Sequence, residues 1–182
     1  MTTRTVTVVA LAVWIVLGQL GGFVPAGPTQ NLVWAFSSAG LVVASPLLAL
    51  RSFRDGRDLS AAGHLVLTAA AMVMYAGGPI STPEGQASFS MALFFYPVAL
   101  LLISAERAHP MFSRVLGGVA ALPFALFGAL ALARVDLPES TRQALMAAGY
   151  LPMTAAVAGW IVGLVRPALP HTAPTASGRV AA

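Results

Sequence analysis

The feature that most constrains this chain is a series of long apolar runs, each separated from the next by a short stretch of charged residues, proline or glycine. A helix of about 20 predominantly apolar residues is long enough to cross the hydrocarbon core of a bilayer. The predicted fold is therefore an all-α integral membrane protein, a single domain built as a bundle of six transmembrane helices. The predicted spans cover about residues 5–24, 32–50, 59–80, 87–104, 112–133 and 144–165.

Composition agrees with this interpretation. Hydrophobic residues make up 58% of the chain and charged residues only 9%, which is far from the composition of a soluble domain. The first run follows Arg4 and has the form of a secretory signal peptide, but the stretch GGFVPAGPTQ after it offers no small-x-small cleavage site. We therefore expect a retained helix. Residues 167–182 are rich in proline, serine and threonine, so we expect them to form a disordered cytoplasmic tail.

The positions of the arginines test the number of spans independently, because basic residues are retained on the cytoplasmic side of a bacterial membrane. With six spans, only Arg134 and Arg142 fall on the outer side, and a shift by one span would destroy this sorting. We therefore predict that both termini are cytoplasmic. The arginines assigned to the cytoplasmic side are Arg4, Arg51, Arg54, Arg57, Arg107, Arg114, Arg166 and Arg179.

Two residue types are absent from the sequence. Without cysteine the chain has no disulfide, no thiolate metal site and no cysteine nucleophile. Without lysine it cannot hold retinal as a Schiff base. All ten basic residues are arginine, and together with the high alanine, valine and glycine content this is typical of a GC-rich bacterial genome. We therefore expect a multi-pass protein of the bacterial cytoplasmic (inner) membrane.

Other partners and cofactors are not predicted. The net charge of +4 does not indicate a nucleic-acid partner, because the arginines lie at segment ends with no interleaved aromatic residues. The three histidines, His64, His109 and His171, lack the close spacing of a zinc site or a bis-histidine haem site. We expect no cofactor and no metal. The lipid bilayer is the expected partner, joined by a membrane protein or by further copies of the chain.

A polar face on the third run is the first candidate site. At about 100° per residue, Ser60, His64, Thr68 and Tyr75 share one face of a helix, which we expect to point toward other helices. His64 is the one ionisable side chain clearly inside a span, and such residues are functional candidates. Two interpretations remain open: a packed or interfacial histidine hydrogen-bonded to Ser60 or to a backbone carbonyl, or a polar lining for a small ligand or a proton step.

Carboxylates on the outer side form the second candidate site. Glu84 lies in the loop STPEGQ, and Asp136 and Glu139 lie in VDLPES. Such groups can perform general acid–base chemistry on a lipid or isoprenoid. The alternative is that they are solvated loop charges or helix caps, and Glu139 has the position of a first-turn acid at a helix start.

Helix packing in a membrane depends on small residues that let backbones approach closely. Such residues recur every four positions in the fifth and sixth runs, which predicts a packing seam on each. Interior prolines in the second, fourth and sixth runs, Pro46, Pro97 and Pro152, are compatible with three copies of a helical hairpin. The residues of the predicted seams are Gly117, Ala121, Ala125, Ala129 and Ala133, and then Ala155, Gly159 and Gly163.

For function, the sequence favours a non-enzymatic accessory or interaction component of a membrane assembly, because no charged pathway and no catalytic pair is recognisable. One alternative is a small-molecule or lipid transporter with a polar path along the third span, lined by His64, Thr68 and Tyr75. The other is a membrane enzyme acting on a lipid-soluble substrate near Glu84.

Overall fold

A computed structural model describes residues 1–78 and 82–166. Within these ranges the chain is entirely helical and has no strand, and its six helices are each long and apolar enough to cross a membrane. The end of the predicted third span and the predicted tail, residues 167–182, lie outside the described residues. The helices are α1 (Thr3–Gly21), α2 (Pro28–Arg54), α3 (Asp58–Ala76), α4 (Pro83–Ala105), α5 (Met111–Leu132) and α6 (Glu139–Val165).

Three helices, α2, α4 and α6, extend by four or five residues beyond the apolar runs that predicted them, and α4 does so by beginning at Pro83. α2 begins at Pro28, where a missing backbone N–H leaves no donor unpaired, and it continues to Arg54. Arg51 and Arg54 stand in its last turn, where positive charge stabilises the helix dipole. The first half of the charged stretch RSFRDGRD therefore belongs to α2, and its last residue, Asp58, begins α3. α6 begins at Glu139, because its first turn is stabilised by an acidic residue rather than by apolar burial.

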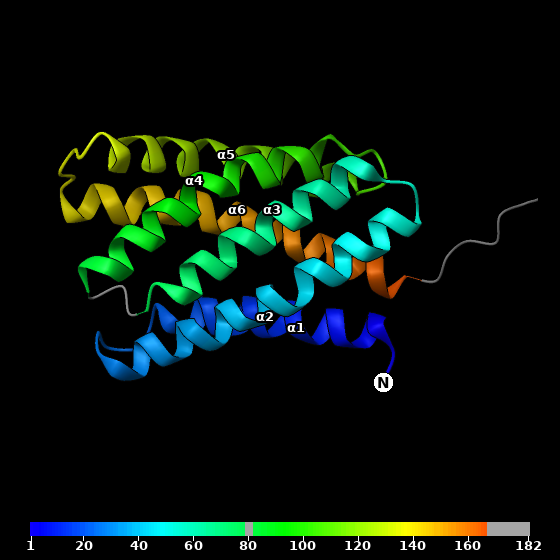
Figure 1. Cartoon of the computed structure of the whole chain (residues 1–182), viewed down its shortest axis with the longest axis horizontal. Helices are drawn as coiled ribbons and strands as arrows, with labels where there is room; N and C mark the ends of the chain where they lie inside the picture. Colours follow the sequence, from blue (N-terminus) through cyan, green and yellow to red (C-terminus); the bar gives the residue numbers. More distant parts are fainter. Residues whose placement is uncertain (79–81, 167–182) are drawn as a thin grey trace, which may run out of the picture.

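The helices run up and down in chain order, and each packs against the next (Figure 1). The chain also closes on itself, since α1 meets α6, although this contact is less extensive than the others. The side-chain amide of Gln19 donates to the Thr154 hydroxyl at 3.0 Å, and Arg4 donates to the Val165 carbonyl. The start of α1 and the end of α6 therefore lie at the same end of the bundle, as an even number of antiparallel helices requires.

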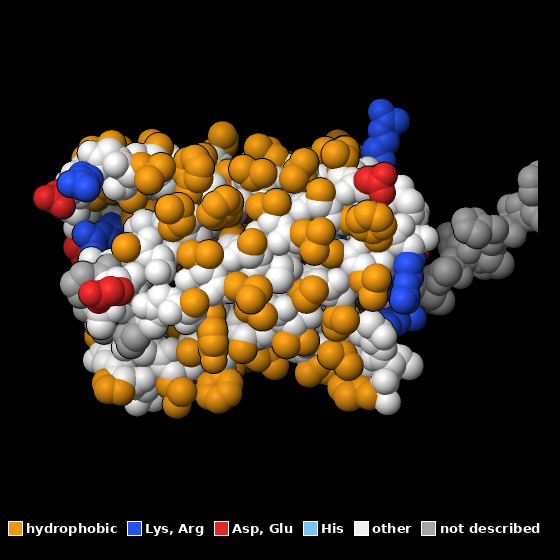
Figure 2. All heavy atoms as spheres, in the orientation of Figure 1, with side chains coloured by type: hydrophobic (Ala, Val, Ile, Leu, Met, Phe, Trp, Pro, Cys, Tyr) orange, Lys and Arg blue, Asp and Glu red, His pale blue; other side chains and the backbone are white. Residues whose placement is uncertain are grey.

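Charged side chains gather at the two ends of the bundle, and apolar side chains cover the band between them (Figure 2). We call the end with the N-terminus and the α2–α3 and α4–α5 loops the basic end, because seven of the described arginines lie there with only three acidic residues. The opposite end is called the far end. Its charged residues in the described chain are Glu84, Arg134, Asp136, Glu139 and Arg142.

The middle of the bundle is filled by side chains from several helices. The rings of Tyr96 from α4, Phe124 from α5 and Tyr150 from α6 pack edge to face, with centroids between 5.0 and 6.4 Å apart. Such arrangements are favourable beyond the area that they bury. Around this aromatic group lie aliphatic side chains with no exposed surface, namely Leu41, Leu67, Leu93 and Met153.

Glycines bring neighbouring helix backbones together. A Cβ atom at Gly63 of α3 would lie 2.9 Å from the Ala99 carbonyl oxygen and 2.7 Å from the Ile103 side chain, both on α4. Gly40 of α2 approaches the Ala10 carbonyl of α1 in the same way. Close backbone approach at small residues is the expected basis of helix association in a membrane.

The predicted small-residue seams are largely wrong. On α5 Gly117 and Ala121 are buried, but Ala125, Ala129 and Ala133 are exposed. The reason is geometric: a step of four residues overshoots one helical turn by about 40°, so a strict four-residue ladder rotates away from its interface. On α6 only the middle residue is buried, and Ala155 and Gly163 are exposed while Gly159 packs against Phe112.

Interior prolines are more widespread than the sequence pattern indicated. α5 also carries one, Pro123, so prolines do not mark the even-numbered helices alone. Each helix continues through its proline. The three-hairpin repeat stays a prediction.

Candidate functional site

The buried polar residues nearest to the basic end form a compact group. Ser52 comes from the end of α2, Ser60 and His64 come from adjacent turns of α3, and His109 comes from the α4–α5 loop. Trp160 of α6 packs against both histidines. We call these five residues the buried polar cluster.

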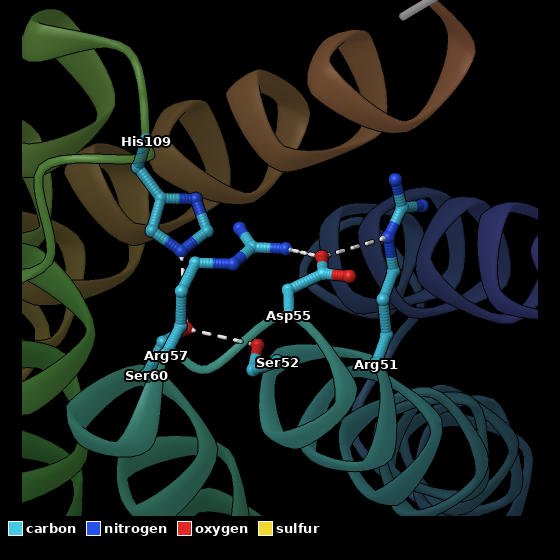
Figure 3. A network of polar contacts seen from close by, with 6 residues as sticks. All are labelled: Arg51, Ser52, Asp55, Arg57, Ser60 and His109. Atoms are coloured by element: carbon cyan, nitrogen blue, oxygen red, sulfur yellow. Dashed lines mark hydrogen bonds and ion pairs between the residues drawn. The ribbon is translucent and has the colours of Figure 1, made fainter.

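Two hydrogen bonds connect three parts of the chain within this cluster. The hydroxyl groups of Ser52 and Ser60 lie 3.2 Å apart, and the Ser60 oxygen lies 3.2 Å from Nε2 of His109 (Figure 3). Beside them Arg57 pairs with Asp55, which also lies 3.8 Å from Arg51. These interactions hold together the end of α2, the start of α3 and the α4–α5 loop.

His64 lies deeper and is fully buried, with no exposed surface. Its ring stands edge-on to Trp160, with centroids 5.1 Å apart, and lies 6.4 Å from the ring of His109. Neither ring nitrogen has a hydrogen-bond partner among the described residues. His64 is therefore a packed histidine, which the first interpretation allowed, but the expected hydrogen bond to Ser60 or to a carbonyl is wrong, because Ser60 bonds to Ser52 and His109 instead. An unpaired buried polar group costs about 1–3 kcal/mol of stability.

His109 belongs to the loop, outside the helices, and is largely enclosed. Burial lowers the pKa of its imidazole from 6.5 to about 4, and the neighbouring Arg57 and Arg114 act in the same direction. Glu106 opposes them and raises this pKa. His109 is therefore uncharged at neutral pH and fits among the arginines without repulsion.

The predicted polar face of α3 does not stay together in space. Ser60 and His64 are buried, but Thr68 is partly exposed and its hydroxyl donates to the His64 carbonyl at 2.8 Å, within the same helix. Tyr75 is 58% exposed and points away from the bundle interior. A helix face is covered only where another helix crosses it, and crossing helices diverge on either side of that point. The expectation that Tyr75 faces other helices is wrong.

The outer carboxylates occupy ordinary positions at helix starts and in a loop. Glu84 is exposed in the first turn of α4, and Glu139 is in the first turn of α6, where negative charge stabilises the helix dipole. Glu139 also pairs with Arg142 at 3.5 Å. Asp136 lines a cleft at the far end. In the described part of the chain, no three histidine, aspartate or glutamate side chains converge as metal ligands.

Sequence reasoning missed the pairing of Ser60 with His109, because the two residues are 49 positions apart and their spacing carries no signal. A serine hydroxyl on a histidine nitrogen is the arrangement of an activated nucleophile. Here the serine is fully buried and also bonded to Ser52. It lines neither the cleft at the far end that Asp136 lines nor a groove between α1 and α2 that includes Val9 and Val43. The hydrogen bond between Ser60 and His109 therefore stabilises the contact of α3 with the α4–α5 loop.

No protein-family model, no curated protein and no solved structure matches this chain.

Proposed function

We propose that this chain is a multi-pass protein of the bacterial cytoplasmic membrane, with both termini in the cytoplasm, that works as a non-enzymatic accessory or interaction component of a membrane assembly. The distribution of charge supports the orientation. The basic end has an excess of arginine over acidic residues, the far end does not, and cytoplasmic loops are the ones that retain arginine.

The filled middle of the bundle is the observation that carries the proposal. Transporters bind their substrate near the bilayer midplane, commonly where helices are interrupted and expose backbone groups. Here the helices continue through their prolines, and the centre is occupied by the packed rings of Tyr96, Phe124 and Tyr150. A bundle with a packed centre is suited to binding a partner on its outer surface, and it offers no path for a solute.

The buried polar cluster fits the same role. Its hydrogen bonds hold the α2–α3 and α4–α5 segments in fixed relative positions, so the basic end presents a defined surface. That surface carries Arg54, Arg107 and Arg166 without an intramolecular ion pair in the described chain, which leaves them free for a partner or for lipid head groups.

Photo-cross-linking in the native membrane tests this proposal. A photoreactive phenylalanine analogue replaces outward-facing Val43, Leu122 or Leu151 in separate variants, and buried Leu41 is the matched control. We expect at least one outward position to give an adduct of defined mass with one protein partner or with a second copy of the chain. Adducts with lipid alone at all three outward positions would contradict the proposal.

Transport remains the alternative that one observation favours, namely the unpaired ring nitrogens of buried His64. Proton movement separates the two functions. The purified chain is placed in lipid vesicles that contain pyranine, and a pH gradient is imposed across the membrane. The accessory role predicts the same rate of dissipation as in protein-free vesicles. A faster rate that His64→Ala abolishes and that exposed Tyr75→Phe leaves unchanged would instead support a proton pathway.

A further inference from the structure

A cleft at the far end is lined by both charged and apolar side chains. It has a volume of about 300 Å³ and lies between α4, α5, the α5–α6 loop and the start of α6. Arg134, Asp136 and Arg142 line its mouth, and Phe89 and Phe127 form an apolar wall. By contrast, the groove of similar size between α1 and α2 is lined by apolar residues throughout. We call the first hollow the far-end cleft.

Both arginines of this cleft are exceptions to the charge sorting of the chain. The other seven arginines of the described chain lie at the basic end, and Arg134 and Arg142 are the two that do not. Loops on the far side of the membrane usually contain few arginines. Arg134 of the α5–α6 loop and Arg142 of α6 nevertheless both line the far-end cleft. Membrane topology does not account for them, so a local role is required.

Arg134 also adopts a backbone conformation that does not suit it. Its N–H bonds to the Ala131 carbonyl, and the N–H of Val135 bonds to the Leu130 carbonyl, which is the hydrogen-bond pattern that ends a helix in a left-handed residue. That position normally holds glycine, but Arg134 has φ of 54°. Glycine would adopt this conformation without strain, so an arginine at this position indicates a role for its side chain.

The charged groups of the far-end cleft are available to a ligand. The side chains of Arg134 and Asp136 have no hydrogen-bond or ion-pair partner within the described ranges. Arg142 has only the exposed pair with Glu139 at 3.5 Å, and exposed pairs of this kind are weak. An incoming anion can therefore replace Glu139 without loss of a strong interaction.

We propose that the far-end cleft binds an anionic amphiphile, with its phosphate or carboxylate between Arg134 and Arg142 and its apolar part against Phe89 and Phe127. Paired guanidinium groups suit these planar or tetrahedral anions, because each offers several fixed N–H donors. Asp136 is placed to accept a hydrogen bond from a hydroxyl or ammonium group next to the anion. This inference rests on the proposed membrane orientation but not on the proposed accessory role.

The test measures lipid retention by the purified full-length chain, using native mass spectrometry with added phosphatidylglycerol, or with phosphatidylcholine as the zwitterionic comparison that has no net charge. Arg134→Gln combined with Arg142→Gln is expected to weaken phosphatidylglycerol binding about tenfold, because charge-assisted hydrogen bonds are among the strongest polar contacts. Arg4→Gln combined with Arg51→Gln removes the same charge from two basic-end arginines that already have partners within the chain, and it is expected to leave phosphatidylglycerol binding within about twofold. Equal losses in both double variants would overturn the proposal.

Two further variants separate binding from folding. Arg134→Gly removes the side chain but relieves the left-handed strain, so it is expected to weaken binding while raising the melting temperature by about 2–4 °C. Glu139→Gln frees Arg142 and is expected to tighten binding. Unchanged binding in Arg134→Gly would contradict the site. Displacement of the lipid by inorganic phosphate alone would assign the cleft to a soluble anion and overturn the amphiphile.

Discussion

The two ends of the bundle use their polar residues in opposite ways. At the basic end, serine hydroxyls, a histidine and four of the seven arginines bond to other parts of the chain. At the far end, Arg134 and Asp136 have no such partner in the described chain, and Arg142 has a weak one. The basic end therefore bonds its buried polar groups and most of its arginines to the chain, and leaves Arg54, Arg107 and Arg166 unpaired on its surface. At the far end, the charged groups without a strong partner are gathered in one cleft.

This difference shows what a count of polar residues leaves out. The basic end has more charged residues than the far end and also contains His64 and His109. The sequence therefore placed the first candidate site there. Yet the buried polar side chains of the basic end cannot be reached from outside, and the hydrogen bonds of Ser52, Ser60 and His109 stabilise the fold. Charges that lie in a cleft and lack partners are better candidates for binding than charges that are already paired, even where they are fewer.

The largest expected effect comes from removing the ring that covers both histidines. Trp160→Ala should destabilise the chain by about 3–5 kcal/mol, because a buried tryptophan is replaced by a cavity next to His64 and His109. The measurement is equilibrium unfolding in mixed micelles. Leu151→Ala on the same helix is the control, since Leu151 is 60% exposed and its loss should change little. Equal effects would mean that the basic end is not closed by this packing.

The close approach of α3 and α4 next to His64 gives the second prediction. Gly63→Ala should cost about 1–3 kcal/mol, because the added Cβ would meet the backbone of Ala99 and Ile103 and the helices must separate. Gly118→Ala is the matched control on α5, where nothing lies within 4 Å of the added atom. There a gain in stability is expected from better helix propensity. A stable Gly63→Ala variant would show that the two helices are not tightly packed.

Acidification should weaken the basic end. The pKa of His109 is about 4 in the folded chain, against 6.5 for an ordinary histidine. Burial is the largest cause, Arg57 and Arg114 lower the pKa further, and Glu106 opposes them. The ring of His64 also lies next to His109, with centroids 6.4 Å apart. The unfolded chain therefore binds more protons between these values, so the contribution of His109 is complete above pH 6.5 and falls toward pH 4. We expect a loss of about 1–2 kcal/mol between pH 7 and pH 5. His109→Gln should reduce this pH dependence, and an unchanged profile would contradict the assignment.

The smallest effect compares one serine at each end. Ser60→Ala should destabilise the chain by about 1 kcal/mol, because Ser52 and His109 both lose a hydrogen-bond partner. Ser90→Ala, in the far-end cleft, should change stability by less than about 0.5 kcal/mol, since no other described residue depends on that hydroxyl. The comparison between the ends fails if the two substitutions have the same effect in thermal unfolding.

The fold was predictable to a large extent because bilayer thickness fixes the length of an apolar run. Six helices in the predicted order follow from that constraint. Helix bounds were less accurate, since the ends of α2 and α6 are stabilised by proline and by charges that suit the helix dipole, not by hydrophobicity.

The candidate site was predicted only in part. Ser60 and His64 lie in the bundle interior as expected, but Tyr75 does not, because helical periodicity gives a direction and not the presence of a neighbour. The contacts of His109 and Trp160 with His64 join residues far apart in the sequence, and no local pattern encodes them. The far-end cleft was not predicted, although the sequence contained one signal that could have pointed to it, the two arginines on the side with few basic residues.

The placement of the two ends on opposite sides of the membrane is the central claim, and cysteine labelling tests it most directly. The natural chain has no cysteine, so single substitutions label without background. Ala108→Cys lies in the α4–α5 loop at the basic end, and Ser140→Cys lies at the far end, both at exposed positions. In intact bacterial cells a membrane-impermeant maleimide should label Ser140→Cys at once and Ala108→Cys only after the membrane is permeabilised. Labelling of both from outside, or of Ala108→Cys alone, would contradict the account.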